Sequence, residues 1–151
     1  MTKDIPCKYG ESIKFIRVPI NDNSKENIKK YFSITNSFIE EVRRQNGKVL
    51  IHCQAGVSRS ATIVLAYLMR IFNVSVNEAF SFVVKRRLDI DVRNCKFFIQ
   101  LNEYEKEIFW KVEPADLKML LEFNANKTPI REISQVLDYL YIGKYIVDFR
   151  K

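Results

Sequence analysis

Residues 47–60 read GKVLIHCQAGVSRS, and this stretch decides the fold because it joins a strand pattern to a helix pattern through a short loop. The run GKVLI, residues 47–51, is apolar and β-branched after a glycine, which predicts a buried strand. The run SATIVLAYLMRIF, residues 60–72, has almost no polar residue before Arg70, which predicts a largely buried helix. The loop between them is therefore expected at the N-terminus of a helix.

The residues between Cys53 and Arg59 have the composition of an anion-binding loop. The first backbone N–H groups of a helix have no partner within the helix and, with the helix dipole, favour an anion there. Small residues in the loop let the backbone curl and turn successive N–H groups inward. Arg59 adds a planar guanidinium that can bind two phosphate oxygens. We therefore predict that phosphate binds to Arg59 and to the loop residues Gln54, Ala55, Gly56, Val57 and Ser58.

The same environment favours a reactive thiol at Cys53. Helix N-termini and nearby cations can lower a cysteine pKa from about 8.5 to roughly 3.5–7.5. We expect Cys53 to attack phosphorus and form a phosphocysteine that water hydrolyses, while the loop amides and Arg59 stabilise the equatorial oxygens. Ser60, next to the arginine, can donate a hydrogen bond to the sulfur as it leaves.

Cys53 and His52 also have ordinary structural interpretations. A single cysteine after a buried strand is usually an inert core residue, and His52, the only histidine of the chain, alone would indicate a satisfied structural group. The combination with Gly56, Arg59 and Ser60 at these spacings favours the phosphate site. We expect His52 to orient the loop rather than act as a base, because successive side chains of a strand point to opposite sides. Ser-His-Asp chemistry and histidine-rich metal sites are not expected.

The pattern His-Cys-x5-Arg-Ser resembles the signature of the cysteine-dependent protein phosphatases, and QAGVSRSATIVLAYLM resembles their dual-specificity branch. Similar segments run from about Ile13 to Glu105, namely FIRVPINDN, NSFIEEVRRQNGKVLIHC, VNEAFSFVVKRR and NCKFFIQLNEYE. The resemblance implies an α/β fold of the protein-tyrosine-phosphatase type, with a central mixed sheet flanked by helices, and catalysis without metal or organic cofactor. It also implies that Asn94 supports the phosphate loop, although a helix N-cap role explains Asn94 equally well.

The resemblance further implies a general acid, because a carboxylic acid on a mobile loop protonates the leaving oxygen in this family. The matching position is Asp22, in PINDNSKENI after the segment KFIRVPI. The alternative for Asp22 is a turn-forming role beside Asn21 and Asn23. Asp89 and Asp91 are the competing carboxylates.

The sequence predicts one compact domain, since 151 residues with 47% hydrophobic content suffice for a single core. Ser75 and Glu78 form a capping box at the start of one helix. The expected strands lie at 13–19 and 48–52, and the expected helices at 24–45, 59–72, 75–87 and 94–110.

Charge and composition bear on partners and location. The net charge of +7 suits anionic partners, and we expect phosphorylated proteins to be the substrates. The basic residues are scattered along the chain, so no nucleic-acid partner is expected. No apolar run of about 18 residues, signal peptide or lipidation motif is found, so no membrane association is expected. Three cysteines without paired spacing fit a reducing compartment, which indicates the cytoplasm or nucleus.

The order of segments departs from the family beyond Trp110. Residues 133–146, ISQVLDYLYIGKYI, resemble the segment that ordinarily begins a dual-specificity phosphatase domain, and no counterpart of one central strand is found. We assign residues 1–110 to the catalytic region, 111–132 to a linker with a short helix, and 133–151 to the displaced segment. A circular permutation, a piece of a tandem array and a misassembled gene model each explain this order.

A missing central strand leaves an edge beside the phosphate-loop strand. That edge is filled by the C-terminal segment, by a second chain or by nothing, and an open hydrophobic edge favours association. Our hypothesis is that residues 133–147 return to the same sheet. They do so either within one chain, which gives a monomer, or between two chains, which gives a domain-swapped dimer.

Two classes of function follow. The first is a protein phosphatase that acts on phosphotyrosine and on phosphoserine or phosphothreonine, with phosphoinositide and RNA 5′-phosphate as open alternative substrates. The second is a catalytically weak phosphate-binding module, in which an incomplete sheet keeps the anion pocket and loses turnover.

Overall fold

The computed structural model describes residues 13–92, 96–109 and 133–144. The predicted linker helix within 111–132 and the candidate Asn94 lie outside the described residues. In chain order the elements are the 3₁₀ helix η1 (Lys29–Tyr31), α1 (Phe32–Arg44), β1 (Val49–Cys53), α2 (Arg59–Phe72), α3 (Val76–Val84), α4 (Phe97–Phe109), β2 (Ile133–Leu137) and β3 (Leu140–Lys144).

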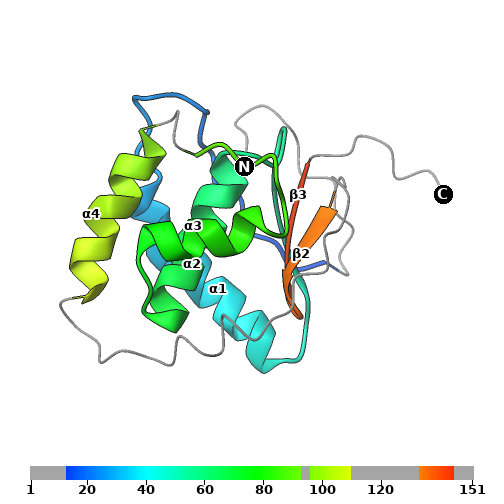
Figure 1. The fold of residues 1–151 in the computed structure, drawn as a ribbon. Coiled ribbons are helices and arrows are strands. Elements are labelled where there is room, and N and C mark those ends of the chain that lie inside the picture. Colours follow the sequence, from blue (N-terminus) through cyan, green and yellow to red (C-terminus); the bar gives the residue numbers. More distant parts are fainter. Residues whose placement is uncertain (1–12, 93–95, 110–132, 145–151) are drawn as a thin grey trace.

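The three strands form one mixed sheet in the order β1-β3-β2. β3 runs parallel to β1 and β2 runs antiparallel to β3, so the C-terminal hairpin lies beside the strand that leads into the phosphate loop (Figure 1). The backbone N–H of Val49 also donates to the carbonyl of Tyr139, in the hairpin turn, at 2.7 Å. The hypothesis that the C-terminal segment returns to this sheet is confirmed for residues 133–144.

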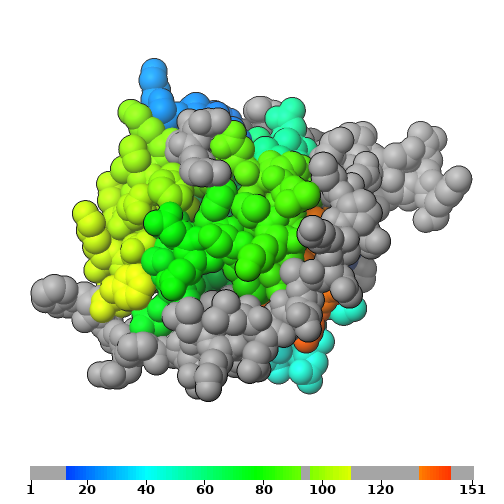
Figure 2. Space-filling model, viewed as in Figure 1, coloured from blue at the N-terminus to red at the C-terminus, as the bar shows by residue number. Residues whose placement is uncertain are grey.

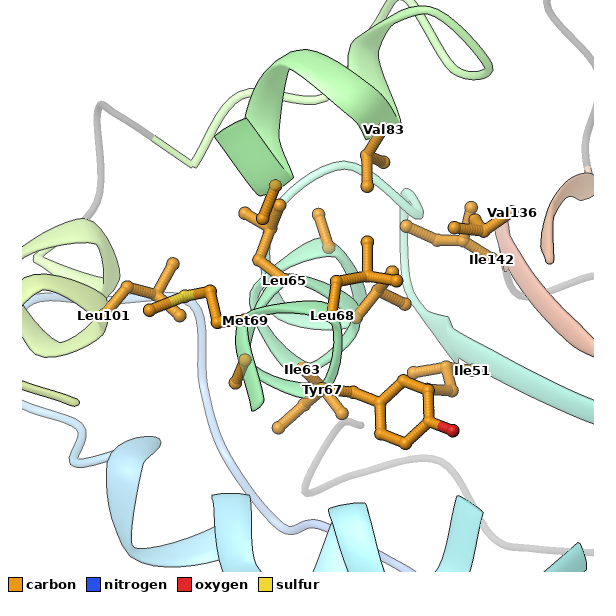
Figure 3. Packing of buried hydrophobic residues seen from close by; sticks show 14 of the residues in the cluster. Ile51, Ile63, Leu65, Tyr67, Leu68, Met69, Val83, Leu101, Val136 and Ile142 are labelled. Atoms are coloured by element: carbon orange, nitrogen blue, oxygen red, sulfur yellow. The ribbon is translucent and has the colours of Figure 1, made fainter. Parts of the chain in front are cut away.

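Helix α2 is the centre of the core. Its residues from Arg59 to Met69 are all buried, as its continuous apolar sequence predicts. Figure 3 shows this helix end-on, with Met69 directed toward α4 and Leu65 toward α3. Tyr67 extends toward β1 and α1, and Leu68 lies on the side of the sheet. Because α2 is packed on every side, its N-terminus, where the phosphate loop ends, is held in one position.

The remaining helices surround α2, and α4 lies farthest from the sheet (Figure 1). On the face shown in Figure 2, side chains of α3 and the segment after it, in green, lie between α4 in yellow and the hairpin in orange. The α/β class with a mixed sheet flanked by helices is confirmed. No single helix in the described part of the chain has the length and apolarity to cross a membrane; α2 and α3 would do so only together, and they meet at a 118° bend.

The predicted strand at 13–19 is wrong for the described structure, which has no strand there. Val18 and Ile20 are buried in an alternating pattern, but a strand needs a neighbour with which to exchange backbone hydrogen bonds. β3 pairs with one edge of β1, and among the described residues no strand pairs with the other edge. The segment thus has the side-chain pattern of a strand without a described partner.

Several helix boundaries also differ from the prediction. The first α-helix begins at Phe32, directly after the 3₁₀ helix η1, rather than at residue 24. Side chains hold the backbone before η1 in a loop: Asn21 N–H donates to Glu26 Oε1 at 3.1 Å and Lys25 N–H to Asn23 Oδ1 at 2.9 Å. Helix α3 ends at Val84 instead of residue 87, and α4 begins at Phe97 instead of residue 94. The capping box of Ser75 and Glu78 is confirmed.

Candidate active site

The phosphate loop joins the C-terminal end of β1 to the N-terminal end of α2. Cys53 is the last residue of the strand and Arg59 the first of the helix, which confirms the predicted strand-loop-helix order. Gly56 has a φ of 76°, in the region that favours glycine. A Cβ atom on Gly56 would lie only 2.7 Å from the backbone of Gly143 in β3. Both the backbone conformation and the neighbouring strand therefore require glycine at this position.

The Cys53 thiol lies inside this loop and is only 1% exposed. The amide N–H of Gly56 donates to Sγ at 3.2 Å, and Oγ of Ser60 lies 3.2 Å from the same sulfur. Burial by itself raises the pKa of the Cys53 thiol, but the hydrogen bonds with Ser60 and Gly56 and the charge of Arg59 outweigh burial, so the net pKa is lowered. The contacts of the loop therefore make this thiol more acidic than an ordinary cysteine.

Arg59 and Asp22 meet at the other end of the loop. The Arg59 guanidinium donates to the carbonyl of Ile20 at 3.2 Å, and its Nε lies 3.6 Å from Oδ2 of Asp22. Oγ of Ser58 donates to Oδ1 of Asp22 at 2.9 Å. The side chain of Arg59 is 7% exposed, whereas that of Asp22 is 31% exposed. Asp22 thus lies at the boundary between the phosphate loop and solvent.

The other predicted site residues occupy less enclosed positions. Gln54 and Ala55 are exposed, and Val57 is half-buried. His52 is half-buried in β1, opposite Gly143 of β3. Burial lowers the pKa of His52, which keeps its imidazole neutral at pH 7. The supporting role of His52 stays a prediction.

The structure adds a contact that the sequence did not indicate, on the carbonyl side of the loop. Nε of Arg87 donates to the carbonyl of Gly56 at 3.0 Å, and a terminal nitrogen of Arg87 lies 3.4 Å from the carbonyl of Ala55. The backbone N–H of Asp91 donates to the carbonyl of Val57 at 3.1 Å. Three consecutive loop carbonyls are thus bound by the segment that follows α3. Sequence spacing gives no signal for contacts between positions this far apart.

Asp89 and Asp91, the carboxylates that compete with Asp22, belong to this second set of contacts. The carboxylate of Asp89 pairs with Arg87 at 3.1 Å. The Asp22 carboxylate, in contrast, lies 3.6 Å from Nε of Arg59. In the described part of the chain, no three His, Cys, Asp or Glu side chains gather where a metal ion could bind.

A thiol of lowered pKa in a loop that leads into the N-terminus of a buried helix, with the charge of an arginine acting on it, is the environment of a nucleophilic cysteine. The family model for the dual specificity phosphatase catalytic domain matches residues 1–107, and the chain belongs to this family. The chain is 41% identical over 110 residues to dual specificity protein phosphatase Mpk3 of Drosophila melanogaster, covering 72% of this chain and 26% of that protein. It is 39% identical over 108 residues to human dual specificity protein phosphatase 1, covering 72% and 29%. The chain therefore spans less than a third of the length of these relatives.

Solved structures agree with this assignment. The crystal structure of the human tyrosine phosphatase-like serine/threonine/tyrosine-interacting protein has a TM-score of 0.65 and 38% identity, covering 68% of each chain. The crystal structure of human DUSP28 has a TM-score of 0.68 and 28% identity, covering 73% of this chain and 76% of that one. The described hairpin, residues 133–144, lies beyond the residues that the family model matches.

Proposed function

We propose that this chain is a protein phosphatase that hydrolyses phosphotyrosine and phosphoserine or phosphothreonine esters through a phosphocysteine on Cys53. The observation that carries the proposal is the environment of the Cys53 sulfur. The sulfur contacts the Gly56 amide and the Ser60 hydroxyl, and the charge of Arg59 acts on it. These three groups stabilise a negative charge on sulfur, which is the form that attacks phosphorus.

The reaction has two displacements at phosphorus. In the first, the Cys53 thiolate forms the S–P bond while the bond from phosphorus to the ester oxygen breaks, and Asp22 gives a proton to that oxygen. In the second, water attacks the phosphocysteine, the S–P bond breaks, and inorganic phosphate leaves. Ser60 then donates to the thiolate that is regenerated. Asp22, once deprotonated, can accept the proton of the attacking water.

Phosphate binding is assigned to the loop and to Arg59. The amides of residues 54–58 are proposed to bind the equatorial oxygens together with the N-terminus of α2. The Arg59 guanidinium, held by the carbonyl of Ile20, presents a fixed cation beside them. Because this recognition concerns the phosphate group, phosphoinositide and RNA 5′-phosphate remain the alternative substrates.

The test is phosphate release from an aryl phosphate by the purified chain without added metal, beside Cys53→Ser. We expect turnover by the natural chain and a loss of several orders of magnitude in Cys53→Ser, because a serine hydroxyl is far less ionised than this thiol. Orthovanadate should still bind to Cys53→Ser, since the loop is unchanged. Equal turnover by both proteins would refute the nucleophile.

A phosphate-binding module is the second candidate, and one observation favours it. Within the described residues β1 has a neighbouring strand on one side, so the sheet that carries Cys53 is small. One similar solved protein is the human tyrosine phosphatase-like serine/threonine/tyrosine-interacting protein. This candidate predicts orthovanadate binding without turnover in both the natural chain and Cys53→Ser, so the same experiment separates the two functions.

A further inference from the structure

We propose that Arg87 is a positioning residue: it binds the carbonyls of the phosphate loop from behind, keeps the amides turned toward phosphate, and couples the loop to the C-terminal hairpin. The proposal rests on the phosphate site described above and extends it to residues outside the loop. It concerns Arg87, Asp89 and Ser134, which no sequence pattern connects.

The first step is the geometry of the peptide unit. In a trans peptide the N–H and the C=O point in opposite directions, so amides that face a bound anion require carbonyls that face away from it. A carbonyl turned into the protein needs a donor. The loop carbonyls of residues 55, 56 and 57 all have one: Arg87 binds the first two and the backbone N–H of Asp91 binds the third.

The second step is that Arg87 is held in one orientation. Its side chain is 3% exposed, and a buried guanidinium is stable only with its charge and its N–H groups satisfied. Asp89 supplies the negative charge, with Oδ1 at 3.1 Å from Nε. The remaining terminal nitrogen of Arg87 lies 3.4 Å from Oγ of Ser134, which is also buried. The planar guanidinium, held by these partners, fixes the positions of the loop carbonyls that it binds. A lysine ammonium on a flexible stem lacks this fixed geometry.

The third step connects the loop to the hairpin. Ser134 belongs to β2, and Gly143 of β3 packs against Gly56 of the loop. The site that a Cβ on Gly56 would occupy is 2.7 Å from the Gly143 backbone and 2.9 Å from a terminal nitrogen of Arg87. The loop is therefore enclosed between Arg87 and β3. Residues 133–144, although last in the described chain, support the conformation of a loop eighty positions earlier.

The experiment compares Arg87→Met with Arg86→Met as a matched control. Arg86 is its neighbour and is also buried, 8% against 4% exposed, but it lies over the ring of Phe82 and donates to the carbonyl of Phe82. Three quantities are measured in each protein. The first is the pH midpoint of iodoacetamide alkylation at Cys53, which is monitored by mass spectrometry of the Cys53 peptide. The second is the Kd for orthovanadate, and the third is the melting temperature.

We expect Arg87→Met to raise the pH midpoint of Cys53 alkylation by about one pH unit and to weaken the binding of orthovanadate about ten- to hundredfold, because the loop amides lose their orientation. Arg86→Met should lower the melting temperature and leave both site measurements at the natural values. Ser134→Ala should change the midpoint and the Kd in the direction of Arg87→Met, by a smaller factor.

An Arg87→Met protein that melts lower but keeps the natural midpoint and Kd would overturn the proposal. If that variant does not fold, Arg87→Lys decides, because it keeps the charge and loses the fork; a natural midpoint and Kd in Arg87→Lys would overturn the proposal equally. None of these measurements needs turnover. Absent turnover with intact orthovanadate binding would refute the phosphatase function alone, whereas absent orthovanadate binding and an ordinary Cys53 pKa in the natural chain would refute both.

Discussion

The acidity of Cys53 is set by opposing effects at single atoms. Burial favours the neutral thiol, while the Ser60 hydroxyl, the Gly56 amide and the Arg59 charge favour the thiolate. Because the net effect lowers the pKa of Cys53, the thiolate persists to a lower pH than that of an ordinary cysteine and disappears as the pH falls through the lowered pKa. By linkage, the stability gained from this shift is complete above the ordinary pKa and is lost over the same fall in pH.

A pH profile tests this balance. The rate of Cys53 alkylation should rise with pH with a midpoint lower than that of an ordinary thiol, and Ser60→Ala should shift the midpoint upward because one stabilising hydrogen bond is lost. Ser37→Ala, at an exposed position of α1, is the control and should leave the midpoint unchanged. A midpoint that does not move in Ser60→Ala would show that the hydroxyl does not stabilise the thiolate.

The role of Asp22 is tested by the leaving group. Asp22→Asn should lower kcat on an alkyl phosphate such as a phosphoserine peptide by about 10²–10⁴-fold, and much less on an activated aryl ester, whose leaving oxygen needs no proton. Asp91→Asn is the comparison among the competing carboxylates and should keep the natural ratio of the two rates. Equal losses on both substrates in Asp22→Asn would mean that this carboxylate only holds Arg59 and Ser58 in place.

At the scale of elements, a tyrosine pair joins the hairpin to the helices. The buried Tyr67 of α2 donates to the Glu40 carboxylate of α1, and its oxygen lies 2.9 Å from the hydroxyl of Tyr139 in the hairpin turn. Since Tyr67 has one proton and gives it to Glu40, the proton between the two hydroxyls comes from Tyr139. Burial raises the pKa of Tyr139, so this donor stays protonated at physiological pH.

Tyr139→Phe should therefore destabilise the protein by about 0.5–1.5 kcal/mol, the usual contribution of one such hydrogen bond. For a chain of this size the melting temperature should fall by roughly 2–4 °C per kcal/mol. The control is Tyr141→Phe in the same hairpin, where the hydroxyl makes a long, exposed contact with the carbonyl of Asp138 at 3.4 Å. Equal melting temperatures for Tyr139→Phe and the natural chain would show that the hairpin does not dock through this pair.

Elements defined by local sequence were predicted well. Of the features that depend on distant pairing, the return of the C-terminal segment to the sheet was predicted, whereas two others were not. Helix α2 and strand β1 follow from continuous apolar runs, and the loop between Cys53 and Arg59 from spacing along one stretch. The expected strand at 13–19 failed because a strand depends on a neighbour that no local pattern supplies. Arg87 was missed for the same reason, because its contacts with the loop and with Ser134 exist only after folding.

At the scale of the whole molecule, the hairpin stands in an unexpected order along the chain and yet completes the core. The described chain stops at Phe109 and resumes at Ile133, so 23 residues connect α4 to β2. Such a length can extend to roughly 75–80 Å, which permits docking within one copy or exchange between two copies. A circular permutation, a piece of a tandem array and a misassembled gene model stay the three hypotheses for this order. In each case residues 133–144 occupy the edge of β1 on the hairpin side of the sheet.

The contribution of the hairpin can be estimated from what it buries. Four apolar side chains, Val136, Leu137, Leu140 and Ile142, are at most 5% exposed. At about 1.5–3 kcal/mol each, their burial contributes roughly 6–12 kcal/mol of gross hydrophobic free energy, from which the conformational entropy of ordering the hairpin is subtracted. Removing the hairpin also exposes the edge of β1 with which β3 pairs. A chain ending at residue 132 should therefore lose cooperative melting, orthovanadate binding and any turnover together. A chain ending at Lys144, which keeps both strands, is the control and should retain them; cooperative melting of the shorter chain at the natural temperature would show that the hairpin is dispensable to the fold.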